Sequence, residues 1–463
     1  MDEIIYRSAA SIAKMIRERQ VSAEEAVKTF LDRIEKVNPN LNAVVQLAGD
    51  RAMAEAREAD KGVANGDVKG PLHGVPITIK DSLDTAGIIS TGGTKGRSTF
   101  VPSQDATVVA RLRRAGAILL GKTNTSELTF SFETSNPVYG RTSNPYDLSL
   151  TSGGSSGGAA AIIAAGGSAL DIGSDSGGSV RVPSHFCGIT CIKPTSGRVP
   201  RTGHIVPFGL GPMDSLTTIG PMARYVEDLA LCLPIISGVD WKDPAIVPMA
   251  LGDPGMVELK RMRVAFFTDN GIITPTTQTI QAVKKAANIL SEAVMQINID
   301  RPEAVVQSLD LFYRLWTAYA GPWRKKLLLQ AGTIERIDPS EFEKTIPTMV
   351  LADLSEDLDR FRSDMLSFME EYDAIVCPVN AYPAIPHGSW KDKYPGFSYT
   401  MTFNLTGWPV VVVRAGTSPE GLPIGVQIVA CPWNEHEALA LAQYLEQALN
   451  GWPSPPLYPT SIL

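Results

Sequence analysis

The sequence predicts an α/β fold in which strands and helices alternate around a sheet. Short apolar runs at 75–79, 117–120 and 169–172 have the length of buried strands. Between them lie segments rich in glycine, serine, threonine and proline, and alanine-rich stretches such as 159–165 that indicate helices. Regular alternation of strand, loop and helix is typical of helices packed on a central sheet.

The segment 1–65 is helical in pattern. Ser22 and Glu25 have the spacing of a capping box, and apolar residues then recur every four positions. The Asn-Pro-Asn run at 38–40 is expected to end this helix, because these residues favour turns. Residues 48–61 are rich in Ala, Glu and Arg and predict a second, exposed helix.

The composition of the rest of the chain changes twice. Residues 70–240 are dense in glycine and serine and form the expected core. Residues 253–375 return to helical patterns and charge, and 376–463 return to the core. Two strands and a closing amphipathic helix are expected near the end, at 374–378, 409–413 and 434–449. Neither a Pro/Ser linker nor an internal repeat divides the chain. We therefore expect one domain over 1–463, with 253–375 as an elaboration that shapes a substrate pocket.

Composition and charge exclude several classes of protein. The 463 residues carry 42 Lys and Arg against 49 Asp and Glu, a formal net charge of −7. This balance argues against a nucleic-acid partner. No stretch reaches the roughly 18 apolar residues of a membrane span, and the first residues lack the pattern of a signal peptide. We expect a cytoplasmic protein that acts on a small molecule, with a homo-oligomer left open.

No metal or cofactor is expected from the sequence. The five cysteines form no Cys-x-x-Cys pair, and the cluster His185, Cys187 and Cys191 lacks a second cluster to complete a tetrahedral zinc site. We expect core thiols, with His185 and Cys187 packing around a loop. The glycine-rich segments match neither the phosphate-loop nor the dinucleotide-binding pattern.

Two glycine- and serine-rich segments have the composition of a nucleophile and an oxyanion site. The segment 152–158 runs directly into an apolar helix, and helix N-termini carry free N–H groups and partial positive charge. The segment 173–179 follows the strand-like run at 169–172. Its successive glycines allow backbone N–H groups to converge on a developing oxyanion. A serine at the end of this loop could attack the bound carbonyl if a base removes its proton.

Lys80 is the candidate for that base. Histidine is the usual base, but His73 and His185 have no obvious acid partner in the sequence. A lysine can serve when burial removes its proton. Alternate residues of 75–79 are apolar, so Lys80 falls at a strand end, where active-site groups gather in α/β folds. A surface lysine paired with Asp81 is the alternative interpretation of this segment.

Several motifs make the sequence resemble the amidase signature family. They are, in chain order, LHGVPITIKD at 72–81, GKTN at 121–124, GGSSGG at 153–158, GSDSGGSVRVPSHFCG at 173–188 and GLPIGVQ at 421–427. The resemblance is dense over about 70–230 and returns at about 400–450. It implies a central mixed, twisted β-sheet covered on both sides by α-helices. It also implies an enzyme that hydrolyses linear amide C–N bonds.

The resemblance implies a Ser–cis-Ser–Lys triad and an acyl-enzyme intermediate. Carried over by motif, Ser179 is the nucleophile, Ser155 is a bridging serine at a cis peptide bond, and Lys80 is the base. The implied oxyanion hole consists of the N–H groups of Ser176, Gly177, Gly178 and Ser179. The implied supporting residues around the triad are Ser156, Ser174, Asp175 and Arg181. Of these, Arg181 is expected to order the loop after the nucleophile rather than touch substrate.

The sequence favours a neutral aryl or alkyl substrate, as an amide, anilide, hydrazide or carbamate. The glutaminase subunit of tRNA-dependent amidotransferases anchors its amino acid with charged groups, whereas the matching stretch at 397–404 here is uncharged. Residues 214–221 read DSLTTIGP where that subunit usually reads SSLDQIGP. Phe130, Phe132 and Phe208 lie in or near the motif loops and are candidate pocket walls or core residues. The glutaminase subunit stays an alternative, as does a non-catalytic scaffold subunit.

Overall fold

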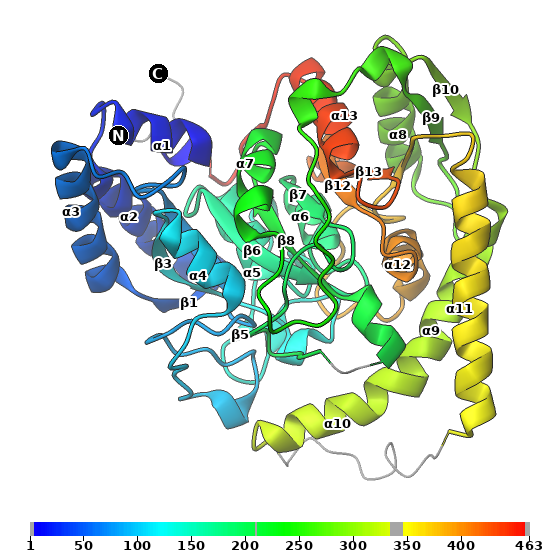
Figure 1. Ribbon diagram of the computed structural model, residues 1–463, viewed down its shortest axis with the longest axis horizontal. Helices are drawn as coiled ribbons and strands as arrows, with labels where there is room; N and C mark the ends of the chain where they lie inside the picture. The colour runs from blue at the N-terminus through cyan, green and yellow to red at the C-terminus, as the bar shows by residue number, and fades with distance from the viewer. Residues whose placement is uncertain (1–3, 209–210, 334–345, 459–463) are drawn as a thin grey trace.

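An eight-stranded mixed sheet forms the centre of the molecule in the computed structural model, which describes residues 4–208, 211–333 and 346–458 (Figure 1). In order across the sheet, the strands are β10 (Gln296–Ile299), β9 (Arg263–Phe266), β11 (Ala374–Pro378), β13 (Pro423–Ala430), β12 (Val410–Thr417), β7 (Thr190–Lys193), β8 (Thr218–Ala223) and β6 (Leu170–Asp175). Strand β9 is parallel to β10 and β11, and the other neighbours are antiparallel. The predicted mixed sheet is confirmed.

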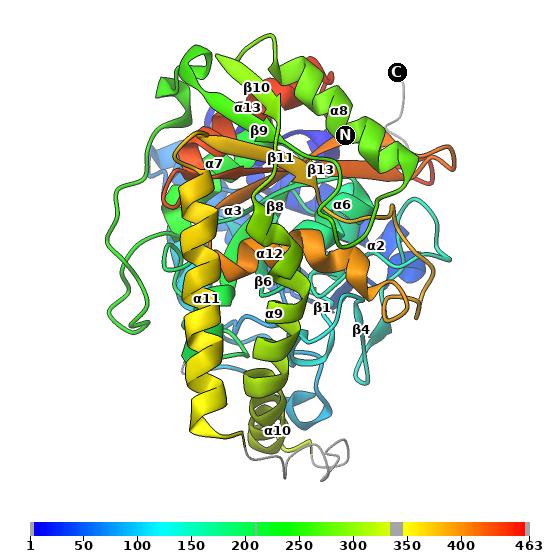
Figure 2. The same ribbon diagram turned by 90° about the vertical axis from the view of Figure 1, so that its right-hand side faces the viewer.

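Helices cover both faces of this sheet, as predicted. Helices α8 (Thr277–Leu290) and α13 (Glu435–Ala448) pack on β11, β12 and β13 from one side. Helices α6 (Arg181–Cys187) and α12 (Ser398–Leu405) lie on the opposite side (Figure 2). The amphipathic patterns of α8 and α13 supply the buried faces that this packing needs, because a surface helix is apolar on one stripe only.

A second, three-stranded sheet carries Lys80. Its strands, in order, are β1 (Val44–Leu47), β3 (Ile118–Thr123) and β2 (Pro76–Lys80). Strand β2 lies beside β6 of the large sheet, and Thr78 Oγ1 donates a hydrogen bond of 2.6 Å to Asp171 Oδ2 across this junction. The C-terminal ends of β2 and β6 therefore meet, which places Lys80 beside the loop that follows β6.

Four N-terminal helices lie near the small sheet (Figure 1). They are α1 (Ala9–Arg17), α2 (Ala23–Leu41), α3 (Gly49–Asn65) and α4 (Thr107–Arg114). The predicted capping box is present, with Ser22 and Glu25 each accepting a hydrogen bond from the other's backbone N–H. The prediction that 38–40 ends this helix is wrong, since α2 continues through Pro39. It ends where Asn42 adopts the left-handed conformation (φ 50°), which breaks the helical path.

The region 253–375 adds a helical arm along one side of the molecule (Figures 1 and 2). It contains α9 (Ser308–Leu315), a π-helical turn (Trp316–Ala320), α10 (Gly321–Gln330) and α11 (Thr348–Phe368). Phe312 and Phe361 from this arm share an apolar core with Phe397 and Phe403 of the motif-bearing half. The arm is therefore packed onto the part of the chain that carries the signature.

No helix in the described ranges combines the length and apolarity that a membrane crossing requires. The elements not yet named are short. The further α-helices are α5 (Gly157–Ala164) and α7 (Val226–Ile236). A two-stranded hairpin consists of β4 (Ser135–Asn136) and β5 (Gly140–Arg141). Short 3₁₀ turns lie at Ile4–Tyr6, Lys95–Arg97, Glu127–Thr129, Gly211–Leu216, Pro254–Met256, Leu259–Arg261, Glu303–Gln307 and Tyr394–Phe397.

Candidate active site

Lys80 ends β2 inside the protein, surrounded by serine hydroxyls. Its Nζ lies 2.7 Å from Ser155 Oγ, 2.8 Å from Ser156 Oγ and 3.0 Å from Ser174 Oγ. The side chain is fully buried, so the alternative of a surface lysine is wrong. Asp81 instead accepts hydrogen bonds from Thr91 and does not pair with Lys80.

Burial sets the protonation of this lysine. It lowers the pKa of Lys80 to about 7, because a charged ammonium loses its hydration there, while the negative charges of Asp175 and Asp171 oppose the shift. A group with a pKa near the working pH is neutral often enough to accept a proton and charged often enough to return it. Lys80 thus has the protonation behaviour that a general base needs, and its contact with Ser155 allows the two groups to exchange a proton.

The loop that carries Ser155 is held from both sides. The peptide bond between Gly154 and Ser155 is cis, as expected at this position. Gly154 packs so closely on the backbone of Glu133 that a Cβ would lie 2.6 Å from its nitrogen. Thr134 Oγ1 donates to Ser155 O at 3.2 Å and accepts from Gly157 N–H at 2.9 Å, so Thr134 fixes the loop at the start of α5.

Ser179 lies on the loop between β6 and α6, and Asp175 holds that loop. Asp175 Oδ1 accepts from Gly178 N–H at 2.8 Å, and Oδ2 accepts from Val180 N–H at 3.1 Å. Ser156 N–H donates to Ser179 O at 3.1 Å, which joins the two serine-bearing loops. Within the described part of the chain, Ser179 Oγ makes no hydrogen bond, so the second link of a relay from Ser155 is not formed in this structure.

Arg181 lies behind the nucleophile loop and does not line the pocket. Its guanidinium binds both carboxylate oxygens of Asp175, at 2.9 and 3.0 Å, and donates to Thr400 O at 3.0 Å and Asn404 Oδ1 at 2.6 Å. Burial raises the pKa of Asp175, but the charge and hydrogen bonds of Arg181 outweigh it and hold that pKa below its ordinary range. The ion pair thus joins the loop to α12 with Asp175 ionised.

One member of the expected oxyanion hole needs correction. The N–H of Gly178 donates to Asp175 Oδ1, and a donor occupied in this way does not face a substrate oxygen. Ser176, Gly177 and Ser179 do line the pocket. A Cβ on Gly177 would lie 3.1 Å from the ring of Phe312, so a larger residue would crowd this side of the pocket. The N–H groups of these three residues are the candidates that the geometry leaves.

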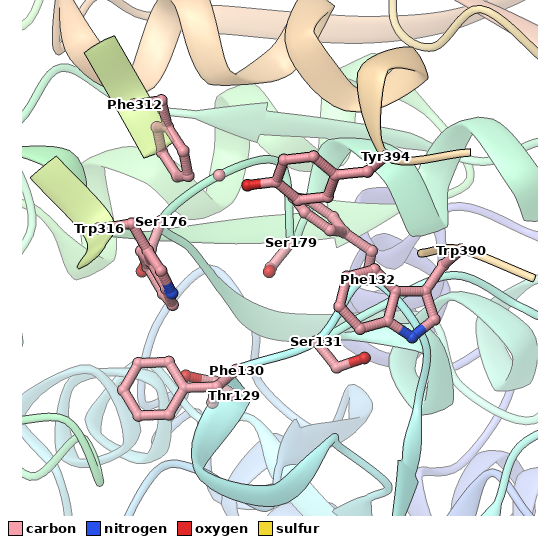
Figure 3. A pocket seen from close by; sticks show the side chains of 11 residues that line it. Thr129, Phe130, Ser131, Phe132, Ser176, Ser179, Phe312, Trp316, Trp390 and Tyr394 are labelled. Atoms are coloured by element: carbon pink, nitrogen blue, oxygen red, sulfur yellow. The ribbon is translucent and has the colours of Figure 1, made fainter. Parts of the chain in front are cut away.

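An aromatic pocket opens onto Ser179 (Figure 3). Phe132, Trp390 and Tyr394 form one wall, and Figure 3 shows Phe312 and Trp316 on the other side of Ser179. The complete described lining is Thr129, Phe130, Ser131, Phe132, Ser176, Gly177, Ser179, Phe312, Trp316, Trp390 and Tyr394. It includes no charged side chain and surrounds about 440 Å³ of space, part of it open to solvent. A lining of aromatic rings and hydroxyls without charge suits a neutral, partly apolar group.

Two of the three residues predicted as pocket walls line this pocket, together with residues that were not predicted. Phe130 and Phe132 line it, whereas Phe208 follows a stretch buried in the core and is not among the described lining residues. The stretch 397–404 does not line it either, since α12 is buried behind the nucleophile loop. Phe397 reaches the pocket indirectly, stacking on Phe132 with ring centroids 4.2 Å apart. Sequence reasoning missed Phe312, Trp316, Trp390 and Tyr394.

Other residues singled out in the sequence have packing roles. His185 is buried, with Nε2 2.9 Å from Tyr382 O and Nδ1 accepting from Gly425 N–H at 2.8 Å. Burial lowers the pKa of His185 to about 4, so it is neutral at pH 7. Cys187 is buried beside Ser152. Among the residues that the structure describes, no three His, Cys, Asp or Glu side chains are grouped as metal ligands.

Comparison with known proteins defines the class of this chain. The family model described as Amidase matches residues 25–439. Fatty-acid amide hydrolase 2 of Homo sapiens is 33% identical over 98% of this chain and 91% of that protein. One subunit of the glutamyl-tRNA(Gln) amidotransferase of Heliobacterium modesticaldum is 31% identical over 96% of this chain and 97% of its own. The structure of 6-aminohexanoate cyclic dimer hydrolase complexed with substrate superposes with a TM-score of 0.87, at 26% identity, over 98% and 99% of the two chains.

The protein is therefore an enzyme that hydrolyses amide C–N bonds. It belongs to the amidase signature family, whose match spans nearly the whole chain.

Proposed function

We propose that the enzyme hydrolyses a neutral amide-type bond with an aryl or alkyl group beside the carbonyl, using Ser179, Ser155 and Lys80. The amide, anilide, hydrazide and carbamate groups all offer such a bond. One observation carries the proposal: the 2.7 Å contact of buried Lys80 with Ser155 lies next to the loop that presents Ser179 to an uncharged aromatic pocket. Apolar walls without a counter-charge favour a neutral ligand, because burying an unpaired charge is costly.

The proposed first half-reaction transfers the acyl group to Ser179. Neutral Lys80 accepts the proton of Ser155, and Ser155 accepts the proton of Ser179 as Ser179 Oγ attacks the carbonyl carbon. The N–H groups of Ser176, Gly177 and Ser179 stabilise the negative oxygen that develops. As the C–N bond breaks, the relay returns a proton to the leaving nitrogen. The products are an acyl-enzyme and a free amine or ammonia.

The proposed second half-reaction uses the same groups to hydrolyse the acyl-enzyme. Water attacks the ester carbonyl of the acylated Ser179, and the relay accepts its proton through Ser155. The oxyanion again faces the loop N–H groups. When the ester bond breaks, the proton returns to Ser179 and the carboxylic acid leaves. Lys80 is then neutral again and ready for another turnover.

The alternative function is that of the glutaminase component of a glutamyl-tRNA(Gln) amidotransferase, since a subunit of such an enzyme is similar to this chain. Free glutamine carries an ammonium and a carboxylate, and each needs a partner when bound. The described pocket lining offers hydroxyls and aromatic rings and no charged side chain. This disfavours glutamine. A non-catalytic scaffold subunit is disfavoured by the intact contact between Lys80 and Ser155.

A substrate panel tests the proposed substrate class. Aliphatic amides, anilides, aryl hydrazides, carbamates and glutamine would be compared by the release of amine or ammonia. Hydrolysis of aryl or longer alkyl amides with little hydrolysis of glutamine is the expected result. Turnover of glutamine alone would instead indicate the amidotransferase component. No turnover of any panel member by well-folded protein would contradict the proposed class.

Ser155→Ala is expected to lower kcat by roughly 10³-fold, because the relay then has no hydroxyl between Lys80 and the nucleophile. Ser155 Oγ contacts only Lys80 among its hydrogen-bond partners in the described ranges, so thermal unfolding should change little. Ser152→Ala is the matched control: Ser152 is equally buried in the same loop, and among the described residues its Oγ makes a hydrogen bond only to Thr142 O, at 3.5 Å. Near-native turnover of Ser155→Ala would remove Ser155 from the mechanism.

Trp316→Ala is expected to raise KM for aryl amides about tenfold and to change kcat/KM for acetamide much less, because a small acyl group does not reach this wall. Tyr313→Ala on the same helical arm is the control, since Tyr313 is exposed and outside the described lining. Steady-state kinetics with both substrates measures the effect. Equal losses for the two substrates would show that the indole does not bind the acyl group.

A further inference from the structure

The direction of the hydrogen bonds around Lys80 decides whether it can act on Ser155. A neutral amine has one lone pair and two N–H bonds. Three hydroxyls surround Lys80 Nζ, and any of them could donate to that lone pair. Ser155 can pass on its proton only if it is the one that does. The two N–H bonds of the lysine are then available to the other two hydroxyls, with Ser174 O a more distant acceptor at 3.5 Å.

Ser156 has a fixed acceptor for its own proton. Its Oγ lies 3.4 Å from the carbonyl oxygen of Ser174, to which it donates. The Ser156 oxygen is therefore left to accept one N–H of Lys80, at 2.8 Å. This contact needs no further residue, because the acceptor is a backbone carbonyl of β6, whose position the sheet determines.

Ser174 depends on a side chain from another segment. Its Oγ lies 3.0 Å from Lys80 Nζ and 3.0 Å from Nε2 of His204. If the Ser174 hydroxyl donates to His204, its oxygen accepts the second N–H of Lys80. If it donates to Lys80 instead, it competes with Ser155 for the lone pair. The state of His204 thus selects between a productive and an unproductive arrangement.

His204 is held at this point by the backbone after β2. Ile205 N–H donates to Ser82 O and Asp84 N–H donates to Gly203 O, each at 2.8 Å, on either side of the histidine. The side chain is buried, and burial followed by the charge of Lys80 lowers the pKa of His204 to about 3. A neutral imidazole has one nitrogen that accepts and one that donates.

We propose that His204 is a positioning residue for the base: its Nε2 accepts a hydrogen bond from the Ser174 hydroxyl and so leaves the lone pair of Lys80 to Ser155. In this state the proton of His204 lies on Nδ1, which is 3.1 Å from Val206 O and donates to it. His204 touches neither the substrate pocket nor the nucleophile. The inference rests on the proposed role of Lys80 as the base.

A double-mutant cycle tests the coupling to Ser174. His204→Leu is expected to lower kcat about tenfold with KM within about twofold, since substrate contacts are unchanged. In the Ser174→Ala background the same substitution should change kcat by less than about twofold, because no competing hydroxyl is left. His204→Gln, whose amide oxygen can accept in place of Nε2, should recover kcat to within about threefold. Equal losses in both backgrounds, or no loss at all, would overturn the proposal.

A measurement without turnover separates this proposal from the proposed function. The ¹⁵N chemical shifts of His204 in the native protein distinguish a bare Nε2 from a protonated one. A bare Nε2 is expected. A protonated Nε2, with Nδ1 accepting from Val206 N–H at 3.2 Å instead, would overturn the proposal even if all kinetic variants lost activity. Full activity of Lys80→Met would contradict the proposed function, whatever the tautomer of His204.

Discussion

Ser179→Ala is expected to reduce kcat for the best amide substrate by roughly 10⁴-fold or more, because the proposed mechanism forms the acyl-enzyme on the Ser179 hydroxyl. The residual rate would come from binding and the oxyanion donors alone. Ser179 Oγ makes no hydrogen bond within the described residues, so its loss should leave the unfolding temperature nearly unchanged. Initial rates and a thermal melt on the same preparation would separate catalysis from stability.

Ser176→Ala is the matched control for the nucleophile. Ser176 lines the same pocket three residues earlier, and its Oγ lies 2.8 Å from Thr217 Oγ1 rather than facing the relay. Its removal should change kcat only a few-fold. With a slowly hydrolysed carbamate, mass spectrometry of the native enzyme should locate the acyl group on the peptide that contains Ser179. Labelling of another serine, or turnover by Ser179→Ala close to native, would reject the assignment.

The sequence predicted the architecture around the proposed triad well, because local signals determine it. The apolar alternation before Lys80 predicted a strand ending at that residue, and β2 ends there. The glycine-rich run before Ala159 predicted a loop opening a helix, and α5 begins at Gly157. Strand β6 precedes the Ser179 loop as expected. In each case the pattern lies within about ten residues, which is the range over which periodicity and turn residues act.

The pocket could not be predicted, because its walls come from segments far apart in the chain. Trp316 lies in the helical arm, Trp390 precedes α12, and Phe130 follows the small sheet. Glu133 binds His387 Nδ1 at 2.8 Å and so joins two of these segments. An aromatic residue in a helical run usually indicates core packing, and only the tertiary fold turns some of these rings toward Ser179.

Hydrogen-bond partners were the second feature of the site that the sequence could not predict. Gly178 belongs to the motif loop, yet its N–H is taken by Asp175, a partner that motif spacing does not reveal. His204 lies outside the sequence motifs that carry the resemblance, so they did not mark it. Its relevance comes from Ser174, thirty positions earlier, and the pairing of the backbone at 203–205 with the residues after β2. Such contacts follow from the junction of the two sheets.

The acidic limb of the pH profile should report the base. In the proposed mechanism Lys80 acts only when neutral, and burial lowers its pKa to about 7. Below pH 7 we expect kcat/KM to fall tenfold per pH unit as the amine takes up a proton, and above pH 7 to level off. Asp175 stays ionised throughout. The pKa of Asp171 is raised to about 7 by burial, so its protonation on the acidic side would remove a negative charge near Lys80 and move the limb slightly lower.

Lys80→Met should remove this limb and lower kcat/KM by roughly 10³–10⁴-fold at pH 8, because no other described side chain within hydrogen-bond distance of Ser155 Oγ can accept its proton. Lys122→Met is the matched control. Lys122 is equally buried, its pKa is lowered by burial to about 8, and it binds Thr85 and Ser90 away from the relay. That variant should lose thermal stability yet keep the limb near pH 7. If Lys122→Met removed the limb and Lys80→Met retained it, Lys80 would not be the proton acceptor. The relay from Ser179 would then end at a different residue.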